Sequence, residues 1–400
     1  AIRMNNSYDN IIIGSGITGL TIAKLLSAKN ISYLILDKNI TMGGKISTIS
    51  LSEYNLDRGF QILLRDYPTL KLFPEINNIP YKKFKSGFAI KKKDKIFKVL
   101  NPLKNFQAIF FNNTFPGFTI KDKYLLIKLF MLSNRYENQN IKVLKFLKDF
   151  GFTESFINDF FISFFQGVFL DKKLNVPLRY FFFIFNLFAT SQVCIPQYGI
   201  NQIIQKIAEK LDYRKIKQNV KVEQIYSNYL TTNSGETFYF KKLLCTDPQI
   251  EGAIDQKINK GFFKNLEYNS TRCFYFKVKI KDIDDCLIYL FPESKNIANM
   301  SFNRLDNDQL ILSASSLSIN SDKDTIENEI LSYFKNMDEI NFLKDIKVVN
   351  ALPSTKDLFN FRDKCFYEYS NQIYFAGDYL SEPSLNGSIQ SGTNLVVSLY

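Results

Sequence analysis

The chain has 400 residues, 46% of them hydrophobic, and its 51 Lys and Arg against 39 Asp and Glu give a formal net charge of +12. This length is enough for two domains and a large core. Histidine is absent, which excludes His-based triads, His metal sites and a His general base. Any proton transfer must therefore use Asp, Glu, Lys, Tyr, Cys or water.

The basic charge has two explanations. The abundance of Lys, Asn, Ile and Phe is typical of AT-rich codons, whereas a functional cause would be attraction to an anionic surface such as membrane lipid. No basic stripe accompanies a nucleic-acid recognition module, so we expect no nucleic-acid partner. One group of lysines is most simply a solvated face and alternatively a peripheral membrane contact: Lys82, Lys83, Lys91, Lys92 and Lys93.

The cysteines are scattered without a C-x-x-C pair, at Cys194, Cys245, Cys273, Cys286 and Cys365. We expect reduced core residues and neither a disulfide nor a metal framework. No apolar run reaches the roughly 18 residues that span a bilayer, and no signal peptide precedes the first expected strand. We therefore expect a cytoplasmic protein, with membrane association as the alternative.

The N-terminal segment has the pattern of a dinucleotide-binding strand, turn and helix. A buried strand ending at Ile13 is followed by Gly14, Gly16 and Gly19 in the order G-x-G-x-x-G. The glycines allow a sharp turn and close approach to a pyrophosphate, which the N-terminus of the next helix faces. Asp37 closes the second strand, where a carboxylate accepts hydrogen bonds from ribose hydroxyls and repels a 2′-phosphate. This favours FAD or NAD over NADP.

Further motifs separate FAD from NAD. They are Met42-Gly-Gly-Lys45, Leu56-Asp-Arg-Gly-Phe-Gln61, Ile373-Tyr-Phe-Ala-Gly-Asp378 and Pro383-Ser-Leu-Asn-Gly-Ser388. With these motifs the sequence resembles the superfamily of FAD-dependent amine oxidases, phytoene desaturases and protoporphyrinogen oxidases. The D-R-G-F-Q and P-S-L-N-G forms are most similar to the desaturase-like oxidoreductases.

The resemblance implies FAD as cofactor and an α/β fold, in which a Rossmann-like FAD-binding domain of the GR2 type is interleaved with an α+β substrate domain. It places residues 1–80, 196–248 and 346–400 in the FAD-binding domain, and residues 81–195 and 249–345 in the substrate domain. Helical spacing over 119–160 includes an amphipathic helix that Gly151 ends. The Phe-rich segment 156–188 is core, the lining of an apolar tunnel, or both.

The resemblance also implies the roles of individual residues. Lys45 supplies charge to the pyrophosphate, Gly59 with its two successors runs along the flavin, and Val222 contacts the adenine through its backbone. Asp378 binds the ribityl or pyrophosphate region, and the N-terminal amides of the last helix stabilise negative charge on reduced flavin. Plain glycine turns and a capped C-terminal helix are the alternatives, and Arg58 is either structural, paired with Asp57, or functional. The expected cofactor-binding residues are Gly14, Gly16, Ile17, Thr18, Gly19, Asp37, Lys38, Gly44, Lys45, Gly59, Phe60, Gln61, Val222, Gly377, Asp378, Leu385, Asn386 and Ser388.

The leading functional hypothesis is an FAD-dependent desaturase or dehydrogenase, or an isomerase, that transfers a hydride from a C–H bond of an apolar, isoprenoid-like small molecule to flavin N5. A flavin amine oxidase, a protoporphyrinogen-type oxidase and a non-catalytic flavin-binding protein are the alternatives. The sequence identifies no catalytic residue and does not define the oligomeric state.

Overall fold

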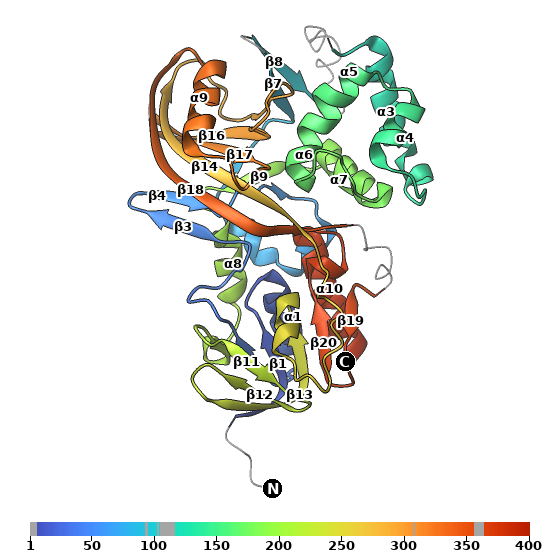
Figure 1. Cartoon of the computed structure of the whole chain (residues 1–400), viewed down its shortest axis with the longest axis vertical. Helices are drawn as coiled ribbons and strands as arrows, with labels where there is room; N and C mark the ends of the chain where they lie inside the picture. The colour runs from blue at the N-terminus through green and yellow to red at the C-terminus, as the bar shows by residue number, and fades with distance from the viewer. Residues whose placement is uncertain (1–5, 93–94, 102–103, 105–116, 307–308, 356–363) are drawn as a thin grey trace.

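The structure is a computed structural model that describes residues 6–92, 95–101, 104, 117–306, 309–355 and 364–400. It has an α/β architecture with two large sheets and a helical cluster beside the second sheet (Figure 1). This mixed fold, with a first sheet whose central strands are parallel, is the predicted class.

The first sheet contains the N- and C-terminal parts of the chain. Its strand order is β10-β2-β1-β13-β12-β11, with β20 paired to β13 and β19 to β20. Pairs β10–β2, β2–β1, β1–β13 and β13–β20 are parallel. The strands are β1 (Ser7–Ile13), β2 (Tyr33–Leu36), β10 (Ile216–Lys217), β11 (Val222–Ile225), β12 (Tyr229–Thr232), β13 (Thr237–Cys245), β19 (Phe366–Glu368) and β20 (Ile373–Ala376).

Helices α1 (Ile17–Ala28) and α10 (Leu385–Leu399) pack against each other on this sheet. The central strands are runs of Ile and Leu because apolar layers cover both of their faces. Strands β12 and β13 are antiparallel and form a hairpin through residues 233–236.

The second sheet has the order β18-β14-β17-β16-β15-β7-β8 and is antiparallel except for the β15–β7 pair. Its strands are β7 (Gly87–Lys92), β8 (Lys95–Leu100), β14 (Tyr268–Ile280), β15 (Ile288–Leu290), β16 (Asn299–Asp306), β17 (Gln309–Ser316) and β18 (Met337–Pro353), and α9 (Lys323–Tyr333) packs on it. The long pair β14–β18 extends from this sheet towards α10 (Figure 1).

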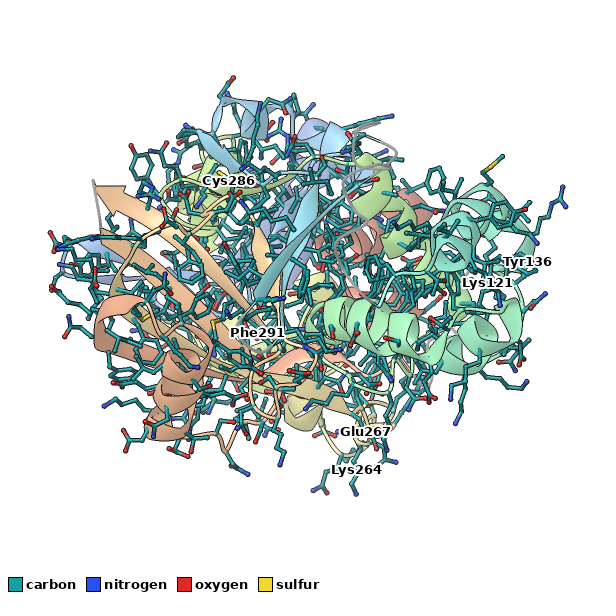
Figure 2. The ribbon with its side chains drawn as sticks, turned by 90° about the horizontal axis from the view of Figure 1, so that it is seen from above. Lys121, Tyr136, Lys264, Glu267, Cys286 and Phe291 are labelled. Carbon is teal, nitrogen blue, oxygen red and sulfur yellow. The ribbon has the colours of Figure 1, made fainter. Side chains whose placement is uncertain are left out.

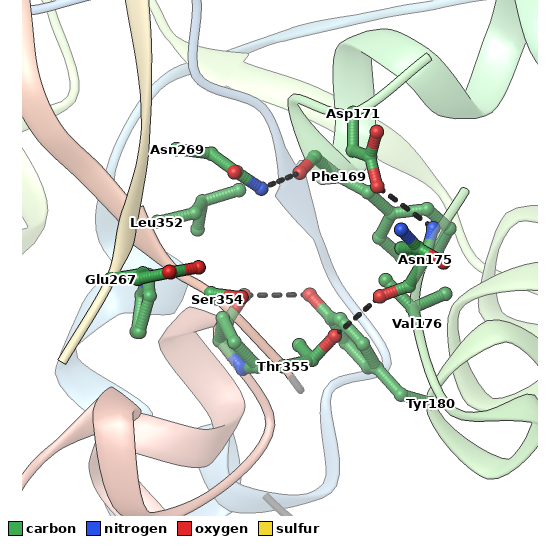
Figure 3. A pocket seen from close by; sticks show the side chains of 12 residues that line it. Phe169, Asp171, Asn175, Val176, Tyr180, Glu267, Asn269, Leu352, Ser354 and Thr355 are labelled. Carbon is green, nitrogen blue, oxygen red and sulfur yellow. Dashed lines mark hydrogen bonds between the residues drawn. The ribbon is translucent and has the colours of Figure 1, made fainter. Parts of the chain in front are cut away.

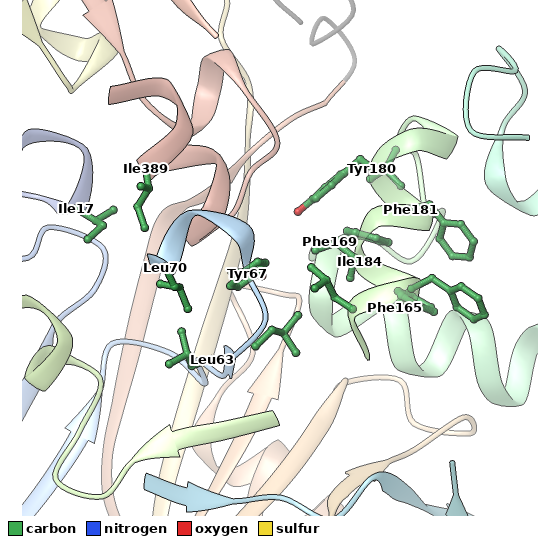
Figure 4. Close-up of a cluster of buried hydrophobic side chains, with 14 of the residues drawn as sticks. Ile17, Leu63, Tyr67, Leu70, Phe165, Phe169, Tyr180, Phe181, Ile184 and Ile389 are labelled. Atoms are coloured by element: carbon green, nitrogen blue, oxygen red, sulfur yellow. The ribbon is translucent and has the colours of Figure 1, made fainter. Parts of the chain in front are cut away.

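The helical cluster is built from the Phe-rich middle of the chain. It contains α3 (Ile120–Tyr136), α4 (Val143–Phe150), α5 (Glu154–Phe156), the π-helical turn η4 (Ile157–Ile162), α6 (Ser163–Phe169) and α7 (Leu178–Thr190). Gly151 ends α4 with φ 104°, as the sequence predicts. Figure 4 shows buried side chains of this cluster, such as Phe165 and Tyr180, with Tyr67 between them and Ile17 and Ile389 of α1 and α10.

Smaller elements connect these parts. A three-stranded sheet has the order β5 (Leu63–Leu64), β9 (Val193–Pro196), β6 (Tyr81–Lys83), and a hairpin is formed by β3 (Thr48–Leu51) and β4 (Tyr54–Asp57). Helix α8 (Asn201–Ala208) follows β9. The 3₁₀ turns are η1 (Pro68–Leu72), η2 (Pro74–Asn78), η5 (Tyr213–Lys215), η6 (Pro248–Ala253) and η8 (Asp378–Leu380).

The predicted solvated lysine face is wrong at two positions. Lys91 is 4% exposed and its Nζ lies 5.6 Å from the centroid of the Phe334 ring, because β7 is an inner strand of the sheet. Lys82 is half-buried and donates to the carbonyl of Phe302 at 2.7 Å. Lys93 lies outside the described residues.

Two predicted absences can be compared with the structure. All five cysteines are free, and four of them are buried. No described helix has the length and hydropathy to cross a membrane.

Candidate functional site

The glycine turn between β1 and α1 is tightly packed. Gly14 has φ 105° and its N–H donates to the Leu36 carbonyl at 2.8 Å. A Cβ at Gly19 would lie closer than 3.0 Å to the carbonyl oxygen of Gly14. Helix α1 begins at Ile17 after Gly16, and no side chain caps its N-terminus. First-turn N–H groups of such a helix are available to an anion.

A second glycine segment lies against the first. Gly43 N–H donates to the Ser15 carbonyl at 3.0 Å, and Gly16 and Gly43 form a parallel bridge. A Cβ at Gly44 would lie 3.7 Å from the Cα of Gly16. The two motifs, about thirty residues apart in sequence, therefore form one backbone-lined surface.

The Asp37 carboxylate lies at the carboxyl end of β2 and is 5% exposed. One carboxylate oxygen accepts from the N–H and the hydroxyl of Ser15, both at 2.6 Å, and the other accepts from the N–H of Asn39 at 2.8 Å. The Asp37 carbonyl accepts from Val220 N–H at 2.9 Å, so the segment leading into Val222 runs beside it. The structure thus brings Asp37, the glycine turn and Val222 to one edge of the sheet.

Two ion pairs join distant motifs at this edge. Lys45 Nζ lies 2.8 Å from a carboxylate oxygen of Asp378, and Lys38 Nζ lies 3.1 Å from one of Asp247. The Gln61 amide donates to the Lys45 carbonyl at 2.9 Å. The predicted pyrophosphate, ribityl and flavin motifs are therefore neighbours in space.

The start of α10 is fixed by three polar contacts. Ser384 caps it by accepting from Gly387 N–H at 3.0 Å, so the helix begins at Leu385. The Asn386 side-chain oxygen accepts from the hydroxyl of Thr69 at 2.9 Å. The Thr18 hydroxyl donates to the Ser388 carbonyl at 3.2 Å. Helix α10 is thus held against α1, and it has the side-chain cap considered as the alternative.

The Asp57-Arg58-Gly59-Phe60 segment differs from one expectation. Asp57 does not pair with Arg58, because its carboxylate accepts from Thr48 at 2.7 Å and from the N–H of Ile200, at the start of α8, at 2.8 Å. Burial raises the pKa of Asp57 to about 6. Arg58 is exposed, whereas Gly59 is buried. Phe60 packs edge-to-face on Phe84, with ring centroids 6.5 Å apart.

A buried hydroxyl tests whether this edge fits a dinucleotide. Tyr379 is 4% exposed, and its hydroxyl has no hydrogen-bond partner among the described residues. Desolvation raises its pKa well above the usual value, with further contributions from Cys245, Tyr268, Asp247 and Asp378. An unpaired donor next to the Gly377-Asp378 turn, together with the uncapped α1, fits the hydroxyls and phosphates of FAD. Gly377, whose N–H donates to Ser391 at 2.7 Å, holds the backbone next to it.

A polar pocket of about 180 Å³ lies beside the start of α10 (Figure 3). Tyr180 is part of its lining and donates to the Pro383 carbonyl at 2.7 Å, and Asn269 donates to the Phe169 carbonyl at 3.1 Å. Its carboxylates are Asp171, which accepts from two backbone N–H groups of its own loop, and the exposed Glu267.

An apolar cavity of about 170 Å³ lies between α3, α6, α7 and the β7–β8 edge. Six phenylalanines of the segment 156–188 line it: Phe156, Phe160, Phe164, Phe165, Phe185 and Phe188. Others in the segment, such as Phe161 and Phe181, are fully buried. The segment is therefore both core and cavity lining. Phe84, which also lines the cavity, connects it to Phe60.

Several residues of the site were missed by sequence reasoning. Thr69 and Tyr180 carry no motif, and only the fold brings them to α10. Ser15 lay inside the glycine motif, where its hydroxyl next to an expected acidic partner was a usable signal. No group of three or more potential metal ligands occurs in the part of the chain that the structure describes.

Comparison with known proteins identifies the family of this chain. Residues 17–251 match the family model of flavin-containing amine oxidoreductases. An oxidoreductase from Methanosarcina mazei is similar in fold (14% identity, 97% of this chain and 99% of that chain covered, TM-score 0.74). So are putrescine oxidase bound to putrescine (11%, 98% and 99%, 0.72) and a CLA-producing fatty acid isomerase from P. acnes (14%, 98% and 99%, 0.72). The matched segment covers more than half of the chain, which belongs to the flavin-containing amine oxidoreductase family and is an FAD-dependent oxidoreductase.

Proposed function

We propose that this enzyme oxidises a C–H bond of an apolar, isoprenoid-like substrate that the Phe-lined cavity holds. When bound, FAD accepts the hydride at N5. The residues proposed to hold FAD are those of the two glycine segments, Asp37, the Lys45–Asp378 pair and the start of α10. The single observation that carries the proposal is the chemical character of the cavity.

The cavity lining is unsuited to a cationic amine. It contains no Asp or Glu among the described residues, and its charged members are Lys85 and Lys123. Burial lowers the pKa of Lys123, which reflects the cost of a cation at this place. An uncharged hydrocarbon avoids this cost and replaces water on the Phe faces.

The cavity size favours an elongated substrate. Its volume of about 170 Å³ is below the roughly 300–1,000 Å³ of pockets that enclose a whole ligand. We infer that it holds one segment of the substrate while the reacting carbon lies towards Phe60, beyond Phe84. The phenyl rings exclude water from this segment.

The tyrosines near the polar pocket act as hydrogen-bond donors in this proposal. Burial raises the pKa of Tyr67 and of Tyr180 above the usual value. Both phenols therefore stay protonated at neutral pH, and Tyr180 holds the Pro383 carbonyl just before the cap of α10. Neither is suited to remove a proton from the substrate.

Amine oxidation is the second candidate, and the polar pocket favours it. Its carboxylates, Asp171 and Glu267, match a cation, and putrescine oxidase shares the fold. In that case an amine would occupy the polar pocket, and changes in the apolar cavity would have no effect.

A matched pair of variants distinguishes the two. Ala189 lines the cavity, whereas its neighbour Thr190 is exposed at the end of the same helix and is not part of the lining. In anaerobic mixing experiments, Ala189→Phe is expected to slow flavin reduction by a polyene at least tenfold and Thr190→Phe to leave it unchanged, with FAD content equal in both. Equal rates for the two variants, or reduction by a diamine alone, would contradict the proposal.

A further inference from the structure

Helix α3 has an exposed apolar stripe next to the cavity. Ile120, Tyr124 and Met131 are 83%, 63% and 75% exposed. With Ile127 they follow the spacing i, i+4, i+7, i+11, which places all four side chains on one face of a helix. A stripe of this kind on a single helix calls for a covering partner.

Cations border this stripe on one side. Lys121, Lys128 and Arg135 are exposed, and helical spacing puts them next to Tyr124 and Met131. Figure 2 shows Lys121 and Tyr136 at the outer edge of the helical cluster. Residues 120–154 contain seven Lys and Arg against four Asp and Glu. One of these carboxylates, Asp122, is fully buried and accepts hydrogen bonds from Thr119 and Thr153, so it adds no charge to the surface. The surface of α3 and α4 is therefore positively charged.

The cavity borders the stripe on its other side. Lys123, Leu126, Ile127 and Phe130 of α3 line the apolar cavity. Ile127 thus belongs to both, so the stripe and the cavity are continuous around the helix. An apolar face beside cations and an apolar cavity fits the interface of a lipid bilayer, where Tyr and Lys side chains reach the headgroups.

We propose that α3 docks this enzyme on the surface of an anionic membrane through Ile120, Tyr124, Ile127 and Met131, with Lys121, Lys128 and Arg135 at the headgroups. Docking brings the cavity to the bilayer, so that an apolar substrate reaches it without crossing water. The docking stands without the proposed function, whereas this delivery route rests on it.

Vesicle binding tests the docking without turnover. The FAD-loaded enzyme is sedimented with vesicles of phosphatidylcholine alone and of phosphatidylcholine with phosphatidylglycerol. Binding is expected to the anionic vesicles and to weaken with salt. The double variant Ile120→Ser, Met131→Ser is expected to lower the partition coefficient roughly tenfold. The control Val349→Ser, Val397→Ser changes two side chains that are 60% and 68% exposed elsewhere and should bind like wild type.

Three results would overturn the proposal. The first is no binding of the wild type to anionic vesicles, and the second is equal binding by the Ile120/Met131 variant and the wild type. The third is a wild-type dimer that the variant dissociates while neither protein binds vesicles, which would mean that a second copy of the chain covers the stripe. Lys121→Gln with Lys128→Gln tests the charge contribution, and it should lower binding to anionic vesicles several-fold while leaving FAD content unchanged. Unchanged binding would contradict the role of these lysines.

Discussion

Lys45 and Asp378, 333 residues apart in the chain, form an ion pair with 2.8 Å between Nζ and a carboxylate oxygen. The Lys45 side chain is 43% exposed and that of Asp378 is 16% exposed, so the pair contributes little to stability by itself. The pair lies between the second glycine segment and the turn after β20. This position suits Lys45 as a cation that balances the pyrophosphate of FAD.

Lys45→Met is expected to weaken FAD retention roughly tenfold, because a cation near a diphosphate is lost. Lys45→Arg keeps the charge and should retain most of the affinity. The measurement is the FAD content after gel filtration at increasing dilution. Lys241→Met, which removes the ion pair of Lys241 with Asp9, is the matched control. Retention in Lys45→Met equal to that in Lys241→Met would remove Lys45 from the site.

Asp37→Ala removes a buried acceptor of four hydrogen bonds that the backbone and side-chain groups of Ser15 and Asn39 donate. The variant also removes the expected acceptor for the ribose hydroxyls of FAD. A hydrogen bond to a charged group contributes about 1.5–3 kcal/mol, so the affinity for FAD should fall roughly tenfold or more. Asp9→Ala changes a β1 carboxylate whose side chain is 42% exposed and pairs with Lys241, and it serves as control. A dissociation constant for FAD that matches that of the control would show that Asp37 does not bind the cofactor.

Gly19→Ala tests the close packing of the glycine turn. The added Cβ meets the Gly14 carbonyl, whereas at Gly252 a Cβ has nothing within 4 Å. We expect Gly19→Ala to lower the free energy of unfolding by about 1–3 kcal/mol and to lower FAD content, and Gly252→Ala to do neither. Chemical denaturation of both variants measures this difference. Stability and FAD content like the wild type in Gly19→Ala would mean that the turn opens freely.

The raised pKa of the buried Asp57 carboxyl makes the stability of the protein depend on pH. Burial raises its pKa in the folded protein from 3.8 to about 6, so the folded state binds more protons than the unfolded state between these values. Stability from this group is therefore highest below pH about 4 and is lost as pH rises to about 6. The upper limit of this loss is about 3 kcal/mol.

Asp57→Asn keeps an acceptor for Thr48 and for Ile200 N–H but has no titration. As pH rises from 4 to 7, the unfolding free energy of the variant should increase relative to that of the wild type by roughly 2 kcal/mol. A difference that stays constant with pH would contradict the raised pKa.

The sequence predicted the local features of this fold well. The strand, turn and helix from Asn10 to Ala28 follow from short-range hydrophobic patterning and glycine chemistry, as does the end of α4 at Gly151. Asp57 was harder, since its partner Ile200 lies 143 residues away, and the neighbouring Arg58 offered a simpler but wrong pairing.

Lys91 shows a second limit. Its lysine-rich surroundings indicate an exposed strand, but the fold places β7 between β15 and β8. The Thr69–Asn386 contact spans 317 residues and has no local signature at all. Patterning thus predicts which elements form, whereas the partners of a site residue depend on the order of strands in space.

The most direct test of the account is the visible spectrum of the FAD-loaded enzyme during anaerobic addition of a polyene and, separately, of putrescine. We expect the polyene to bleach the flavin bands and putrescine to leave them unchanged. Bleaching by putrescine alone would contradict the assignment of the apolar cavity as the substrate site, and a protein that binds no FAD after reconstitution would contradict the cofactor site itself.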